Sequence, residues 1–152
     1  MAIVISHSAS ETQSLGEVWG REVQAGWVIS LSGELGAGKT QLVKGIARGL
    51  GVSERVHSPT FTLMNQYGGG RLPLVHLDLY RLETPDQIIG AGLEEYLCRP
   101  AGITAVEWGE RWFGEFLGSV SRNSSPVTSY RRVQIATTGE TERRIIYEDF
   151  GA

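Results

Sequence analysis

The sequence predicts an α/β domain of three layers, in which a mixed but mainly parallel sheet lies between two layers of helices. Apolar segments of strand length alternate along the chain with amphipathic helical segments, which is typical of this fold class. A glycine-rich turn leads from an apolar strand at 27–32 into a helix at 40–50. Near the C-terminus, strand-like segments on either side of Gly139 predict a terminal β-hairpin. At 152 residues we expect a single domain, residues 1–152.

Two strands and two helices are expected in the first third of the chain. Residues 2–6 form a first apolar strand, and the segment from Ser10 to Gln13 resembles a capping box that opens a helix reaching about Ala25. The buried stripe of this helix is predicted to be Leu15, Val18, Trp19 and Val23. The strand at 27–32 and the helix at 40–50 follow.

The middle of the chain predicts a hairpin and two short helical segments. Residues 61–67 and 74–77 are rich in strand-forming residues and are separated by three glycines, so we expect them to pair in a hairpin. Thr84 and Pro85 suit the N-cap and first turn of a short helix at 86–89. A second helical turn fits 93–97.

The last third continues the alternation of strands and helices. We expect a strand at 103–106, a helix at 110–117, an exposed serine-rich loop at 119–129 and a hairpin built from 133–137 and 144–147.

Residues 33–40, read as GELGAGKT, match the phosphate-binding pattern G-x-x-x-x-G-K-[ST]. Glycines allow backbone N–H groups to turn toward phosphate oxygens, and the N-terminus of the following helix adds partial positive charge. Lys39 can reach the outer phosphates, and the hydroxyl of Thr40 is placed for Mg²⁺. An accidental glycine-rich turn would not be framed by a strand and a helix. We therefore expect nucleoside triphosphate binding by Glu34, Leu35, Gly36, Ala37, Gly38, Lys39 and Thr40.

Two acidic residues follow predicted strands. Asp78 comes directly after the strand at 74–77, and Glu107 after the strand at 103–106. Hydrolysis of a nucleotide needs carboxylates that hold the metal and orient water, and such groups lie where strands of an open α/β sheet end. The alternative is that both are ordinary surface acids. His76 shares the face of Asp78 and is expected to be buried rather than to act as a base.

Two further residues remain open on spacing alone. Thr60 lies on the connection after the loop helix, where many ATPases and GTPases carry a threonine that senses the γ-phosphate. Its position in the sequence is equally consistent with an ordinary loop residue. Trp108 directly follows Glu107, which places it near the site, although most tryptophans are simply core residues.

Composition excludes several classes of protein. The net charge of −3 argues against direct binding of nucleic acid, and the arginine doublets at 131–132 and 143–144 are predicted to be solvated strand ends. One cysteine, Cys98, allows neither an intramolecular disulfide nor a cysteine metal cluster. No apolar run has the length of a membrane span and the N-terminus lacks signal-peptide features, so we expect a soluble cytoplasmic protein. The absence of a guanine-reading Asn-Lys-x-Asp tetrapeptide favours ATP over GTP.

Five motifs in order resemble one family. GELGAGKT is followed by SPTFTL at 58–63, HLDLYRL at 76–82, GLEEYL at 92–97 and VEWGER at 106–111. Together they resemble the TsaE (YjeE) family, small bacterial ATPases required for threonylcarbamoyladenosine (t6A) modification of tRNA. The resemblance covers about residues 10–112 and implies a P-loop NTPase fold.

The resemblance also implies a function. Members of the family bind ATP and Mg²⁺, hydrolyse ATP weakly alone, and dock onto the TsaD–TsaB heterodimer. That heterodimer transfers the threonylcarbamoyl group to the adenosine beside the anticodon, so tRNA is a partner only indirectly, and no membrane is involved.

Residue roles carry over by motif. Lys39 and Thr40 would serve phosphate and metal, and the catalytic group would be Asp78, Glu107, Thr60 and Trp108, with Thr40, Glu107 and Asp78 as candidate metal ligands. After Trp112 the sequence departs from the family pattern. Contacts to base and ribose are expected from the N-terminal segment and the final hairpin, with Gly139 and Arg143 as contributors.

Two other functions stay open on residues alone. A small-molecule kinase would use Asp78 or Glu107 to activate a substrate hydroxyl, although the chain lacks an arginine-rich lid. A pure binding module would use the nucleotide only as a conformational ligand.

Overall fold

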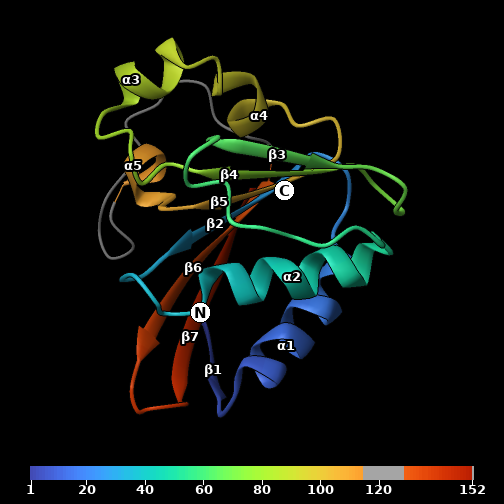
Figure 1. The fold of residues 1–152 in the computed structure, drawn as a ribbon, viewed down its shortest axis with the longest axis vertical. Helices are drawn as coiled ribbons and strands as arrows, with labels where there is room; N and C mark the ends of the chain where they lie inside the picture. Colours follow the sequence, from blue (N-terminus) through green and yellow to red (C-terminus); the bar gives the residue numbers. More distant parts are fainter. Residues whose placement is uncertain (115–128, 152) are drawn as a thin grey trace.

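A computed structural model of the chain describes residues 1–114 and 129–151. Along these residues the elements are β1 (Ala2–Ser6), α1 (Ala9–Glu22), β2 (Trp27–Ser32), α2 (Lys39–Leu50), β3 (Met64–Tyr67), β4 (Leu74–Asp78), α3 (Pro85–Gly90), α4 (Glu94–Cys98), β5 (Ile103–Glu107), α5 (Glu110–Phe113), β6 (Ser129–Thr137) and β7 (Arg143–Gly151) (Figure 1). The predicted loop at 119–128 and the end of the predicted helix at 115–117 lie outside the described residues.

The seven strands form one sheet in the order β1-β7-β6-β2-β5-β4-β3. The central strands β6, β2, β5 and β4 pair in parallel, whereas β1, β7 and β3 pair antiparallel at the two edges. The predicted mixed sheet with a parallel centre and a C-terminal hairpin is therefore confirmed. The parallel centre matters for function because the carboxyl ends of these strands meet at one edge of the sheet.

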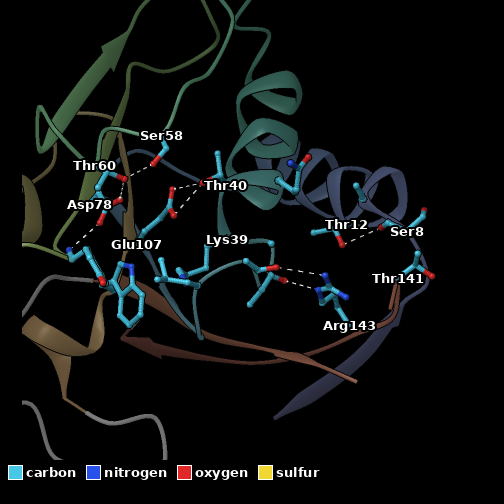
Figure 2. A pocket seen from close by; sticks show the side chains of 18 of the residues that line it. Ser8, Thr12, Lys39, Thr40, Ser58, Thr60, Asp78, Glu107, Thr141 and Arg143 are labelled. Carbon is cyan, nitrogen blue, oxygen red and sulfur yellow. Dashed lines mark hydrogen bonds between the residues drawn. The ribbon is translucent and has the colours of Figure 1, made fainter. Parts of the chain in front are cut away.

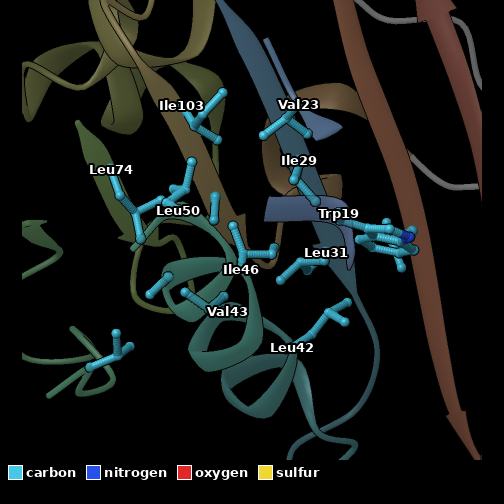
Figure 3. Close-up of a cluster of buried hydrophobic side chains, with 14 of the residues drawn as sticks. Trp19, Val23, Ile29, Leu31, Leu42, Val43, Ile46, Leu50, Leu74 and Ile103 are labelled. Atoms are coloured by element: carbon cyan, nitrogen blue, oxygen red, sulfur yellow. The ribbon is translucent and has the colours of Figure 1, made fainter. Parts of the chain in front are cut away.

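Helices cover both faces of the sheet. Figure 1 shows α1 and α2 on one side and α3, α4 and α5 on the other. The first core packs α1 and α2 against β2, β5, β4 and the C-terminal strands, and includes Trp19, Ile46, Ile29 and Leu31 (Figure 3). The second core packs Ile88, Leu97 and Trp112 against Val28 and Val106. Alternate residues of the central strands thus supply two cores, which explains why these strands are apolar throughout.

The helices α1 and α2 approach each other through glycines. A Cβ built on Gly45 would lie 2.0 Å from the carbonyl oxygen of Gln13, and one on Gly20 would lie 2.3 Å from that of Ile46. Trp19 and Val23 of the predicted stripe are buried, but Val18 is exposed, and the glycines Gly16 and Gly20 are buried in its place. The close approach of the two backbones places small residues at the interface and turns Val18 to solvent.

The start of α1 also differs from the prediction. The N-cap is Ser8, whose Oγ accepts a hydrogen bond from the backbone N–H of Glu11 at 3.0 Å. The carboxylate of Glu11 turns back to accept from the N–H of His7 at 2.9 Å. The capping arrangement therefore lies two residues before the predicted Ser10, and the helix ends at Glu22 rather than near Ala25.

Two strand predictions need correction. Strand β3 begins only at Met64, because residues 60–63 form a turn that ends at Leu63 with φ 69°. The hairpin of β6 and β7 is longer than predicted and begins at Ser129.

The arginine doublet at 131–132 is also not solvated as predicted, since Arg131 pairs with Asp149 at 2.7 Å and Arg132 is buried.

Within the described residues, no helix combines the length and the apolar character needed to cross a membrane.

Candidate functional site

The glycine-rich turn joins β2 to α2 in the way the motif predicts. Gly38 is the N-cap of α2 and has φ 109°, a left-handed conformation that glycine adopts without strain. It provides no side chain to cap the helix, so the first-turn N–H groups of α2 face the cavity without a protein cap. Gly33 opens the loop against β6, where a Cβ would lie 2.5 Å from the carbonyl oxygen of Ile135. The loop is thus both free to bind an anion and closely seated on the sheet.

A cavity of about 510 Å³ lies beside this loop, which is within the size range of small-molecule sites. Figure 2 shows side chains from both halves of the chain around it. The lining residues are Ser8, Ala9, Thr12, Leu35, Gly36, Ala37, Gly38, Lys39, Thr40, Gln41, Ser58, Thr60, Asp78, Tyr80, Glu107, Trp108, Glu140, Thr141 and Arg143. Of the predicted site residues, only Glu34 and Gly139 are outside this lining.

Lys39 is buried at the base of the loop. Its Nζ donates hydrogen bonds to the carbonyl oxygens of Gly33 at 2.6 Å and Glu34 at 2.9 Å, and lies 4.3 Å from the ring centroid of Trp108. Removal from water lowers the pKa of Lys39, and the negative charge of Glu107 partly opposes this shift. The loop carbonyls and the indole ring therefore hold the ammonium group in place at the cavity wall.

Thr40, Glu107 and His76 form a connected group. The Thr40 Oγ1 donates to Glu107 Oε2 at 2.9 Å, and Glu107 Oε2 lies 2.6 Å from His76 Nε2. Both Glu107 and His76 are buried, which confirms that His76 is an interior residue. The imidazole therefore fixes the orientation of the Glu107 carboxylate beside Thr40.

Asp78 and Thr60 form a second group next to the first. The Thr60 Oγ1 donates to Asp78 Oδ2 at 2.9 Å, and the backbone N–H of Tyr80 donates to Asp78 Oδ1 at 2.9 Å. Ser58 Oγ lies 2.8 Å from Thr60 Oγ1. Asp78 and Glu107 are register partners on the neighbouring parallel strands β4 and β5. The sheet itself therefore brings the two predicted acids side by side.

Trp108 occupies an unusual backbone conformation directly after β5. Its φ of 61° is left-handed, which for a residue with a large side chain involves strain of roughly 1–3 kcal/mol. This conformation places the indole between Lys39 and Tyr80, whose ring centroid is 5.1 Å away. The strained turn thus directs an aromatic side chain into the cavity, where the motif predicted it.

The opposite wall comes from the start of α1 and the turn between β6 and β7. Ser8, Ala9 and Thr12 belong to the first segment, Glu140 and Thr141 to the turn, and Arg143 to the start of β7 directly after it (Figure 2). The two segments meet because β1 pairs with β7. The sequence predicts contributions from both regions but singles out only Gly139 and Arg143, because no local signal points to the other residues.

The residues present fit a nucleotide with Mg²⁺. The loop and the start of α2 provide N–H donors, and Lys39 adds positive charge near the carboxylates of Asp78 and Glu107. Among the described residues no three His, Cys, Asp or Glu side chains form a complete metal cage. Mg²⁺ in proteins is commonly held by one or two carboxylates together with waters and substrate phosphates, a role that Glu107 and Asp78 could fill.

Comparison with known proteins agrees with this geometry. The family described as threonylcarbamoyl adenosine biosynthesis protein TsaE matches residues 6–145 of the chain. A tRNA threonylcarbamoyladenosine biosynthesis protein TsaE from Nostoc sp. is 52% identical over 103 residues, 66% of this chain and 63% of that protein. The protein of the same name from Treponema pallidum is 46% identical over 107 residues, 70% of this chain and 78% of that protein. The match with the Nostoc protein therefore spans less than two thirds of that protein's length.

A solved structure gives the same result for the fold. The crystal structure of Bacillus subtilis YdiB matches with a TM-score of 0.73 at 29% sequence identity, covering 96% of this chain and 83% of that one. With a family match over residues 6–145, and with four of the five motifs contributing residues to one cavity, the chain belongs to the TsaE family.

Proposed function

We propose that the cavity binds ATP together with Mg²⁺ and that the chain hydrolyses this ATP slowly when alone. One observation carries the proposal: the N-terminus of α2, the Thr40 hydroxyl and the carboxylates of Glu107 and Asp78 all line one cavity. Phosphoryl transfer depends mainly on positioning and on compensation of charge, and these groups supply both. The chain would act as a single ATPase domain, residues 1–152.

Each group has a defined task in this proposal. Lys39 and the loop N–H groups bind and orient the phosphates, while Thr40 and Glu107 hold the metal. Bound Mg²⁺ would neutralise the charge that develops on the phosphate oxygens. The carboxylate of Asp78 orients the attacking water. Thr60 holds this carboxylate in place through the 2.9 Å hydrogen bond from its Oγ1.

Trp108 and its neighbours enclose the reaction. The indole lies over Lys39 and contacts the ring of Tyr80, so the phosphate end of the cavity has an aromatic wall. Such a wall excludes bulk water and strengthens the electrostatic interactions of Lys39 with bound phosphates.

The biological task follows from the relatives. The Nostoc and Treponema proteins carry names that state a role in biosynthesis of threonylcarbamoyladenosine in tRNA. We propose that this chain serves t6A formation in the cytoplasm by acting on a TsaD–TsaB type complex. Its net charge of −3 favours contact with tRNA through such partners rather than directly.

Calorimetric titration of ATP with Mg²⁺ tests the nucleotide site. The Lys39→Ala protein should lose affinity by about a hundredfold, because a buried cation that contacts phosphate is removed. Lys44→Ala is the matched control, since Lys44 lies on the same helix but outside the cavity lining. Equal affinity of wild type and Lys39→Ala would refute the proposed site.

A turnover assay separates the alternatives. An ATPase releases ADP and free phosphate in equal amounts, whereas a small-molecule kinase forms ADP without free phosphate when its substrate is present. A pure binding module binds ATP with no turnover, with or without the partner complex. We expect equimolar ADP and phosphate across a panel of nucleosides and metabolites.

A further inference from the structure

Arg143 connects the C-terminal hairpin to the phosphate loop. Its Nε donates to the carbonyl oxygen of Ala37 at 3.0 Å, and Nη2 lies 3.5 Å from that of Gly36. Its Nη1 donates to the carbonyl oxygens of Gly139 at 3.2 Å and Glu142 at 3.0 Å. Figure 2 shows the guanidinium pointing at the loop from the hairpin side of the cavity. One side chain therefore holds two separate backbone segments through their carbonyl groups.

The contact with Ala37 determines where a loop donor points. Because the peptide bond is planar and trans, its C=O and N–H groups point in opposite directions. The carbonyl of Ala37 is drawn toward Arg143, so the N–H of Gly38 in the same peptide unit is directed away from Arg143. The N–H of Ala37 is already used within the loop, where it donates to the Glu34 carbonyl at 3.1 Å. The orientation of the Gly38 N–H thus depends on a residue more than a hundred positions away.

The support for Arg143 is itself rigid. Arg143 begins β7, and its backbone is in register with Ser6 of β1 on one side and Thr137 of β6 on the other. The loop also touches β6 at its first residue, where Gly33 packs against the carbonyl of Ile135. The hairpin therefore holds the loop both at its start and in its middle.

We propose that Arg143 is a positioning residue that locks the phosphate loop onto the β6–β7 hairpin and keeps the loop N–H groups ready for phosphate. This inference rests on the proposed function, because it takes the loop to be the phosphate site. It assigns to the hairpin a role in phosphate binding, in addition to its place in the cavity wall that it shares with the start of α1. The planar fork of arginine is required, because one ammonium group does not reach the carbonyls of both segments.

A direct role is the competing explanation, since Arg143 also lines the cavity. If the guanidinium acted as a positive charge on the nucleotide, lysine would preserve much of the effect. If it acts by holding carbonyls on two segments, lysine fails nearly as badly as glutamine. The Arg143→Lys and Arg143→Gln variants therefore give different results under the two explanations.

The first test uses nucleotide-free protein labelled with ¹⁵N. Backbone heteronuclear NOE values of Gly36, Ala37 and Gly38 should fall in both Arg143 variants, which reports faster loop motion. Arg144→Gln is the matched control, because Arg144 is the next residue of β7 and is exposed, and because this variant loses the same positive charge as Arg143→Gln. Unchanged NOE values in Arg143→Gln would overturn the proposal. This test involves no nucleotide, so its outcome is independent of whether the chain binds ATP.

The second test is calorimetric titration of ATP with Mg²⁺ into the same proteins. Both Arg143→Lys and Arg143→Gln should weaken binding about tenfold or more, whereas Arg144→Gln should bind like wild type. Wild-type affinity in Arg143→Lys would overturn the proposal in favour of a direct charge role. If wild type itself binds no ATP, the proposed function fails, while the loop measurement still decides whether Arg143 holds the loop.

Discussion

The glycine contact between α1 and α2 leads to a quantitative prediction for Gly45→Ala. Gly45 lies inside α2, and its added Cβ would be 2.0 Å from the carbonyl oxygen of Gln13 in α1. The closest ordinary contact is about 3.4 Å, so the two backbones must separate by roughly 1.4 Å along this line. No side-chain rotation relieves the clash, because the contacting atoms of α1 belong to its backbone.

The expected loss of stability follows from two opposing effects. Overpacking of this kind typically costs about 1–3 kcal/mol and occasionally more, and a backbone clash lies at the upper end. Alanine regains about 1 kcal/mol of helix propensity over glycine. We therefore expect the free energy of unfolding to fall by about 2 kcal/mol, with Tm lower by roughly 4–8 °C for a chain of this size.

Urea unfolding followed by circular dichroism measures this change. Gly90→Ala is the matched control, because Gly90 ends α3 and its added Cβ would meet nothing within 4 Å. The control should be neutral or stabilised by up to about 1 kcal/mol. If Gly45→Ala is as stable as wild type, the two helices do not pack through their glycines.

Three further predictions concern the cavity. Glu107→Gln keeps an acceptor for Thr40 but loses the charge, so ATP should still bind, with Mg²⁺ affinity reduced and turnover lowered about a hundredfold or more in a steady-state phosphate assay. Thr60→Val should lower kcat about tenfold while Thr60→Ser restores it, because only serine still donates to Asp78; equal kcat of the two variants would contradict this role. Burial lowers the pKa of Lys39 below its ordinary value of 10.5. Between the lowered pKa and 10.5, the unfolded chain therefore binds more protons than the folded one, and the free energy of unfolding of wild type rises with pH relative to that of Lys39→Met. Denaturant titrations of both proteins at increasing pH should show this rise, and a difference in unfolding free energy that does not change with pH would refute it.

The parts of the site that sequence predicts are those with local patterns. The phosphate loop is contiguous, so its residue types and spacing are enough to predict a phosphate site there. Asp78 and Glu107 were predictable because each ends an apolar strand, and parallel pairing then places them side by side. Thr60 and Trp108 were undecided by spacing alone, and both line the cavity.

The parts that sequence missed depend on long-range contacts. Ser8 and Thr141 line the same wall only because β1 adds to β7, a pairing between the two ends of the chain. The position of the N-cap was shifted because Ser8 and Ser10 both satisfy the local capping pattern, and the hydrogen bond from Glu11 decides between them. Apolar periodicity identified Trp19 and Val23 but wrongly included Val18, since it counts large apolar residues whereas the closest contacts with α2 are made by glycines.

The most direct test of the proposed function is ATP turnover measured with and without a purified TsaD–TsaB heterodimer, with Lys39→Ala as the control. We predict slow turnover alone, strong stimulation by the heterodimer, and loss of both in the variant, because Lys39 lies at the base of the phosphate loop. Turnover that the heterodimer leaves unchanged, in protein that binds ATP by calorimetry, would contradict the proposed role in t6A formation.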